Sequence, residues 1–104
     1  RLLYLPDIDS WEAWTDDLAR TLVALRVDVA LLDGSFFSRD ELPRLAQVPH
    51  PLVTDTAARL RGADAEVQII HMNHTNPLLR AGAERGWLLD QGLRVGASGT
   101  SWIL

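Results

Sequence analysis

Residues 67–77 read VQIIHMNHTNP, and this stretch is the most informative part of the chain. Its apolar start, residues 67–70, predicts a strand. His71 and His74 follow that strand directly, and the pair Asn76-Pro77 then signals the start of another short helix. Loops that leave the ends of parallel strands are held by a rigid sheet and stay open to ligands. We therefore expect the chemistry of this chain at the end of this strand.

Apolar runs and turn residues elsewhere predict alternating strands and helices. A helix is expected from Pro51 to about Arg61, stopped by Gly62, and a short one from Asn76-Pro77 is expected to end at Gly86 or Gly92. Residues 35–49 read as a loop with a weak helical patch at 40–45. Further strands are expected at 2–5, 27–32, 93–97 and 101–104, the last two joined across 98–100. The order βαβαβαββ predicts an α/β layered fold with a parallel core.

The first helix is expected to begin at residues 9–12, Asp-Ser-Trp-Glu, which resemble a capping box with Asp9 as the N-cap. Asp9 is accordingly interpreted as a cap in preference to a metal ligand. Apolar residues then recur every three or four positions and form one stripe, so this helix should pack against the sheet. The stripe consists of Trp11, Trp14, Leu18, Leu22 and Leu25, with both tryptophans expected as core anchors.

Composition restricts the classes of protein and partner. A chain of 104 residues with 47% hydrophobic content is long enough for one domain with a modest core. Its net charge of −4 and scattered arginines argue against a nucleic-acid partner, and the absence of cysteine excludes disulfides, thiolate metal sites and cysteine nucleophiles. No apolar run approaches the roughly 20 residues that span a bilayer, and no signal peptide opens the chain. We expect a cytoplasmic protein with no membrane partner.

Polar residues follow each of the first three predicted strands. Asp7, Asp33, His71 and His74 are expected at one edge of the sheet, and His50 should join them because it precedes a helix that starts on the same side. Oxygen and imidazole ligands without cysteine suit zinc, manganese or iron. A metal site at this edge is therefore one interpretation.

Spacing alone leaves simpler interpretations open, because the chain has no His-x-x-x-His pair and its ligands would come from distant strands. Asp7 would then only close a Pro-Asp turn, and Asp33 before Gly34 would be a turn residue. His50, which lies between two prolines, would cap the following helix.

Four segments together resemble the metallo-β-lactamase superfamily and, within it, the group of coenzyme PQQ biosynthesis B proteins. They are YLPDID at 4–9, ALLDGSFF at 30–37, VPHP at 48–51 and HMNHTNP at 71–77. The resemblance implies an αββα sandwich that binds one or two metal ions, of which zinc is expected first. The N-terminal His-x-His-x-Asp-His motif of that superfamily is absent. Residues 1–104 are therefore interpreted as the C-terminal half of such a domain, to be completed by an N-terminal half or by a second copy.

The resemblance also implies a role for each polar residue. Asp7 matches the aspartate that bridges two metals, His71 matches the last histidine ligand, and His50 matches a histidine that donates a proton to the leaving oxygen. Asp33 is expected to accept the remaining N–H of His71 or to contact substrate. His71 is preferred to His74 as the ligand because it follows the strand directly. The residues expected to support a ligand or line the substrate pocket are Asp33, Asn73 and His74.

These roles predict a metal-dependent hydrolase that cleaves a phosphodiester or another ester of a small-molecule substrate with a metal-bound hydroxide. A hydrolytic or oxidative step in PQQ cofactor synthesis is the related possibility. The better known B proteins depart from the usual metal pattern at the position of Asp7, so this chain looks closer to their hydrolase-like relatives. Catalysis is expected of the intact protein and not of 104 isolated residues. The alternative is a non-catalytic remnant or interaction module that binds no metal.

Overall fold

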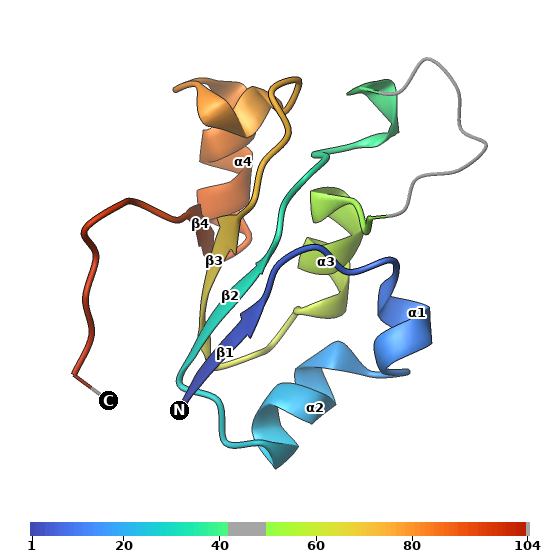
Figure 1. The fold of residues 1–104 in the computed structure, drawn as a ribbon, viewed down its shortest axis with the longest axis vertical. Coiled ribbons are helices and arrows are strands. Elements are labelled where there is room, and N and C mark those ends of the chain that lie inside the picture. The colour runs from blue at the N-terminus through green and yellow to red at the C-terminus, as the bar shows by residue number, and fades with distance from the viewer. Residues whose placement is uncertain (42–49, 104) are drawn as a thin grey trace.

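The computed structural model describes residues 1–41 and 50–103, which form a mixed α/β fold (Figure 1). Four parallel strands lie in the order β1-β2-β3-β4, so each strand pairs with the next one along the chain. They are β1 (Leu2–Leu5), β2 (Val29–Asp33), β3 (Glu66–Ile70) and β4 (Leu93–Val95). The predicted parallel core is confirmed.

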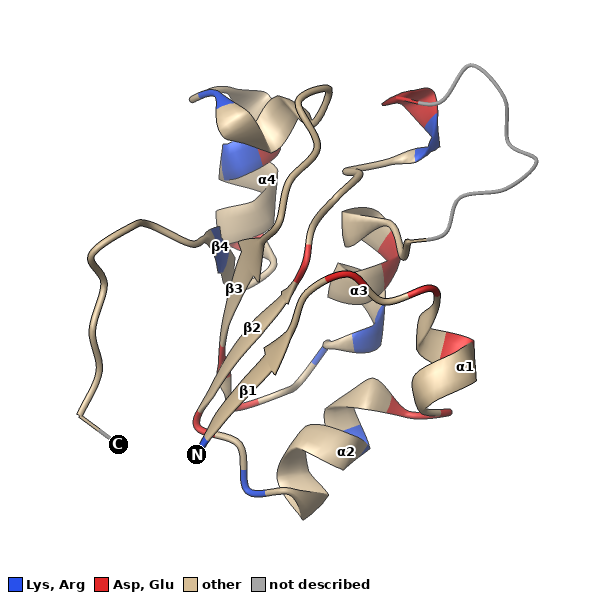
Figure 2. Cartoon of the chain, in the orientation of Figure 1, with Lys and Arg blue, Asp and Glu red and all other residues tan. Residues whose placement is uncertain are grey.

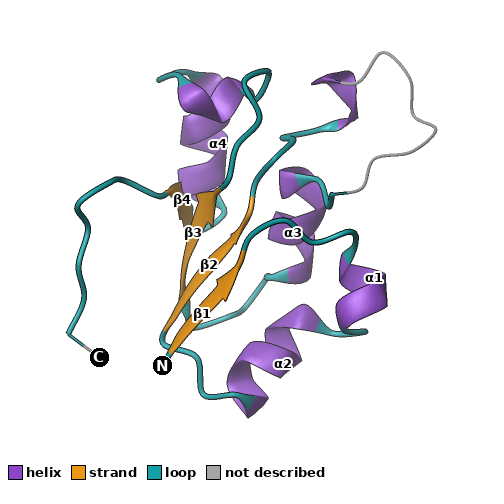
Figure 3. Ribbon diagram, viewed as in Figure 1, coloured by secondary structure: helices purple, strands orange, loops and turns teal. Residues whose placement is uncertain are grey.

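Helices make every connection between these strands (Figure 3). The α-helices are α1 (Trp11–Trp14), α2 (Leu18–Ala24), α3 (Val53–Arg59) and α4 (Ala83–Asp90), and the 3-10 helices are η1 (Arg39–Glu41) and η2 (Pro77–Leu79). Within the described ranges no helix is long and apolar enough to cross a membrane.

The two faces of the sheet differ in cover. On one face, side chains such as Ala30, Val67 and Ile69 are buried and join a core that includes Leu22 of α2 and Leu88 of α4. On the other face, Tyr4 is 61% exposed, and its neighbours across the strands are Leu31, Gln68 and Arg94. The segment after β4 runs beside this second face, where the Trp102 indole N–H donates to Glu66. A helical layer therefore covers one face, and among the described residues only those of the C-terminal segment approach the other.

The first helix differs from its prediction. It is two helices, because Thr15 adopts an extended conformation that ends α1, and the Asp17 side chain accepts from the Arg20 N–H to cap α2. Ser10, and not Asp9, is the N-cap of α1, with its hydroxyl accepting from the Ala13 N–H. The predicted capping box is therefore wrong.

The apolar stripe on these helices is only partly buried. Trp11, Leu18 and Leu22 enter the core, while Trp14 is 39% exposed and packs edge-on against Trp11. The break between α1 and α2 changes the direction of the chain, so the spacing of three and four residues no longer keeps one face inward.

Other boundaries follow the sequence with smaller shifts. Leu52 is the N-cap of α3, so Pro51 lies just outside that helix, whereas Asn76 caps η2 as predicted. Gly86 lies inside α4, and Gly92, with φ of 83°, follows its end. The turn at 97–100 forms, but residues 101–103 form no strand with β4. Part of the predicted helical patch at 40–45 and part of the VPHP segment lie outside the described residues.

Candidate functional site

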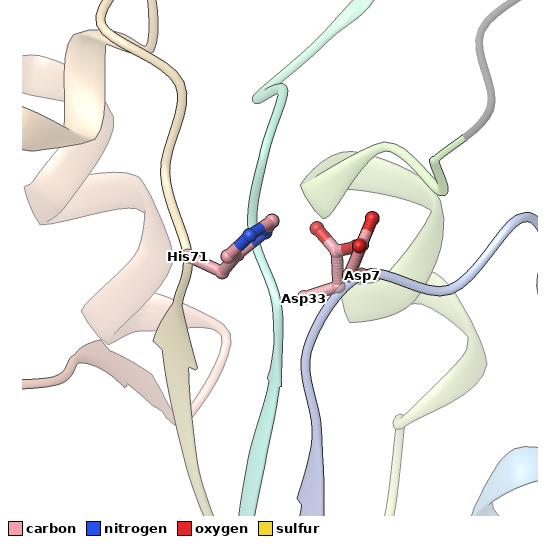
Figure 4. Close-up of side chains that lie close together, drawn as sticks. All are labelled: Asp7, Asp33 and His71. Atoms are coloured by element: carbon pink, nitrogen blue, oxygen red, sulfur yellow. The ribbon is translucent and has the colours of Figure 1, made fainter.

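Three of the predicted residues meet at the carboxyl edge of the sheet. Asp7 follows β1, Asp33 ends β2 and His71 follows β3, and one potential ligand atom from each lies within 4.8 Å of the other two (Figure 4). Asp7 and His71 both have a φ of 58°. This left-handed backbone is uncommon for residues other than glycine and clusters at functional sites. The sheet therefore brings together two carboxylates and an imidazole that are far apart in sequence.

Asp33 is fully buried and anchors the centre of this cluster. Its Oδ1 accepts from the Ser35 N–H at 2.8 Å, and its Oδ2 accepts from the Ile8 N–H at 3.0 Å. The Nδ1 atom of His50 lies 2.8 Å from the same Oδ2. Since a carboxylate only accepts, this Nδ1 carries the proton and leaves Nε2 for another partner. Asp33 thus fixes both the orientation and the tautomer of His50.

The predicted pairing of Asp33 with the N–H of His71 is wrong. The partner of the His71 ring is Ser35, whose Oγ lies 3.2 Å from His71 Nδ1 and 3.3 Å from His50 Nδ1. Sequence reasoning overlooked Ser35. The signal was present, because Ser35 follows Asp33-Gly34 at the same strand end that singled out the aspartate.

His74 and Asn73 lie at different distances from this centre. Asn73 lines a cavity of about 270 Å³ with Ser35, His50 and His71, and its amide donates to Thr75 Oγ1. His74 is exposed and belongs neither to the three-residue cluster nor to that cavity wall. Of the two histidines after β3, the geometry therefore favours His71 as a ligand.

A second cavity, of about 440 Å³, lies on another side of His50. Three carboxylates and one guanidinium line this cavity, so its lining is mainly acidic. They belong to Asp9, Glu12, Asp55 and Arg39. Acidic residues accordingly mark the loop after β1, helix α1 and helix α3 in Figure 2. Arg59 pairs with both Glu12 and Asp55, and the hydrogen bond with Asp55 contributes most to raising the pKa of its guanidinium. His50 thus stands between a cavity next to His71 and an acidic cavity.

The donor set at this edge suits a divalent metal. Nitrogen from imidazole and oxygen from carboxylate are the ligands that zinc accepts, with manganese or iron also compatible. Asp7 and His71 are both exposed, so solvent and ions can reach this side of the cluster. A carboxylate has about four lone-pair sites, and the contacts of Asp33 use three of them, so Asp33 retains one. Two to three ligands therefore come from this chain.

The chain is similar to the protein named Coenzyme PQQ synthesis protein B from Ruegeria pomeroyi, at 33% identity over 85 residues. This match covers 71% of the chain and 29% of the relative, so the chain spans less than a third of the length of that protein. No family model matches the chain, and no solved structure matches it. The similarity agrees with the group that the four sequence segments indicated.

Proposed function

We propose that this chain forms part of the active site of a metal-dependent hydrolase. In this proposal His71 and Asp7 hold a divalent cation, with zinc expected first, and His50 donates a proton to the leaving oxygen of an ester. The observation that carries it is the 2.8 Å contact between buried Asp33 and His50 Nδ1, directly beside the cluster of Asp7, Asp33 and His71.

Each residue has a task that its geometry supports. When bound, a divalent cation would lower the pKa of water and polarise the ester. His71 and Asp7 would hold that cation, and Asp33, whose ligand atom lies within 4.8 Å of theirs, could add a third ligand. His50, oriented through Nδ1 by Asp33, has its Nε2 available for the leaving oxygen. To act as a general acid the ring would carry a second proton, on Nε2, and the Asp33 carboxylate would balance the charge of that imidazolium.

The substrate that we propose is a small ester, with a phosphodiester as the first candidate. Cavities on two sides of His50 give room for the two parts of such a molecule, one beside His71 and the other among Asp9, Glu12 and Arg39. The similarity to a PQQ synthesis protein B supports a second candidate, a step in the synthesis of that cofactor. The interaction module that binds no metal is the competing hypothesis.

Two variants of the full-length protein distinguish a metal ligand from a proton donor. Asp7→Ala should reduce zinc content and lower turnover by several orders of magnitude. His50→Ala should retain zinc, while kcat falls by roughly 10² to 10⁴, the usual contribution of general acid–base catalysis. With two aryl phosphodiesters, the loss in His50→Ala should be smaller for the ester with the better leaving group, since that ester needs less protonation.

Metal analysis and kinetics on both esters measure these effects. Equal losses on the two esters would remove the proton-donor role from His50. Zinc loss in His50→Ala would make that histidine a ligand. A protein that retains no divalent metal and cleaves neither ester would support the interaction module instead.

A further inference from the structure

We infer that Ser35 is a positioning residue that holds His71 with Nε2 as its metal-binding nitrogen. The metal part of this inference rests on the proposed function, whereas the orientation and tautomer of His71 follow from the hydrogen bonds alone. Sequence reasoning assigned Ser35 no role.

The hydroxyl of Ser35 is buried, with 4% of the residue exposed, and it touches three groups. Its Oγ lies 3.2 Å from the His71 carbonyl oxygen, 3.2 Å from His71 Nδ1 and 3.3 Å from His50 Nδ1. A hydroxyl donates one proton and accepts through two lone pairs. Ser35 therefore donates to one of these groups, and it can accept only from a ring nitrogen that carries a proton.

Counting protons selects one arrangement. His50 Nδ1 already carries a proton because it faces Asp33, so it cannot accept from Ser35. If the hydroxyl donates to the His71 carbonyl, its lone pairs can accept from His71 Nδ1–H, and both contacts with His71 are satisfied. If it donates to Nδ1 instead, its contact with the carbonyl is lost. The first arrangement makes one more hydrogen bond, and it leaves Nε2 of His71 deprotonated.

The backbone fixes this hydroxyl in place. The Ser35 N–H donates to Asp33 Oδ1 at 2.8 Å, and the Ser35 carbonyl accepts from the Asn73 N–H at 2.9 Å. The preceding Gly34 N–H donates to the Ile70 carbonyl at 2.6 Å. These bonds join the loop after β2 to the loop after β3 on both sides of the serine. Ser35 is therefore held rigidly against His71.

This arrangement predicts a specific effect on metal binding. A histidine ligand usually donates its second N–H to an acceptor, which fixes the ring and its tautomer, and loss of such an acceptor costs roughly 10- to 100-fold in metal affinity. Ser35→Ala removes the acceptor of His71. Ser35→Thr keeps the hydroxyl, at a position that borders a cavity of about 270 Å³.

The first measurement uses the full-length protein without metal, at an alkaline pH where imidazoles are neutral. Nitrogen-15 NMR of the histidine rings should show Nδ1–H for His71 in the wild type and in Ser35→Thr, and a shift toward Nε2–H in Ser35→Ala. His50 should stay Nδ1–H throughout, because Asp33 holds it. An unchanged His71 tautomer in Ser35→Ala, or a Ser35→Thr variant that behaves like Ser35→Ala, would overturn the inference.

The matched control is Thr56→Ala. Thr56 is another fully buried hydroxyl, which accepts from the Trp11 indole N–H at 2.7 Å and donates to the Leu52 carbonyl. Its loss should lower the melting temperature without changing the tautomer of His71. A change of tautomer in Thr56→Ala would show that general loosening of the fold, and not Ser35, sets the tautomer.

Zinc titration by calorimetry is the second measurement. Ser35→Ala should bind zinc roughly 10- to 100-fold more weakly than the wild type, while Ser35→Thr and Thr56→Ala should match it. A zinc affinity of Ser35→Ala equal to that of the wild type would refute the inference that Ser35 supports metal binding by His71. If the wild type binds no zinc, the proposed function fails, and the NMR result still decides whether Ser35 sets the tautomer.

Discussion

His50 and His71 differ in the group that contacts Nδ1, and this difference suits the two histidines to different roles. The two rings lie at the same edge of the sheet with centroids 6.1 Å apart, yet the Nδ1 of His50 faces a buried carboxylate and that of His71 faces a buried hydroxyl. A carboxylate orients an imidazole and balances the charge that the ring carries during proton transfer. A neutral hydroxyl orients a neutral ring, which is the form that binds metal. The partner of Nδ1, more than the histidine itself, distinguishes the two.

Of the four changes that follow, removing the charge from the partner of His50 should have the largest effect on turnover. In Asp33→Asn the carboxamide cannot balance that charge, and its NH2 group opposes a neighbouring N–H donor. We expect kcat to fall on the order of 10²-fold, within the range of general acid–base catalysis. The double variant Asp33→Asn/His50→Ala should be little slower than His50→Ala, because the two residues act as a unit. Steady-state kinetics measure both, and fully additive losses would break the link between Asp33 and His50.

Gly34 lies between the two partners, so changing it should disturb both histidines. A Cβ at Gly34 would meet Ile69 Cγ2 at 2.0 Å and the Ile70 carbonyl oxygen at 3.0 Å. We expect Gly34→Ala to lower the free energy of unfolding by about 3 kcal/mol, as overpacking of a buried site does. Urea denaturation measures this loss. A Gly34→Ala variant of native stability would mean that β2 and β3 separate easily at this edge.

Replacing Asn76 tests whether the loop after β3 depends on its hydrogen bond with the loop after β2 for its stability. Its Nδ2 donates to the Gly34 carbonyl at 2.6 Å, its Oδ1 accepts from the Leu78 N–H at 2.8 Å, and it is fully buried. Asn76→Ala should cost about 2 kcal/mol, because buried polar groups lose their partners. Hydrogen exchange should quicken near His71 more than near His50. Equal quickening around both histidines would show that the two loops move as one.

The smallest effect should come from Gly86→Ala, which serves as the control for Gly34→Ala. Gly86 lies inside α4, and an added Cβ would meet nothing within 4 Å. Alanine is favoured over glycine within a helix, so we expect stability to rise by about 0.5 to 1 kcal/mol. Neither histidine should respond in its NMR spectrum. A loss of stability, or a response of the histidines, would show that α4 influences the edge of the sheet.

Sequence patterns predicted the strands of this protein and the edge of the sheet where its polar residues gather. The apolar runs identified β1 to β4, because residues covered by other layers must be apolar whatever the path of the loops. The polar residues after three of these strands, Asp7, Asp33 and His71, could be grouped without a structure. Carboxyl ends of parallel strands meet at one edge of a sheet, so this grouping follows from strand order alone.

Only the tertiary structure decided which partners these residues take. Asp33 faces His50, which is 17 positions away, and His71 faces Ser35, which is 36 positions away. A hydrogen bond requires two atoms within about 3 Å, and that depends on the path of each loop, which hydrophobic periodicity does not encode. The break between α1 and α2 escaped prediction for a related reason. The apolar stripe continues across it, while the local hydrogen bonds of Ser10 and Asp17 determine where each helix begins.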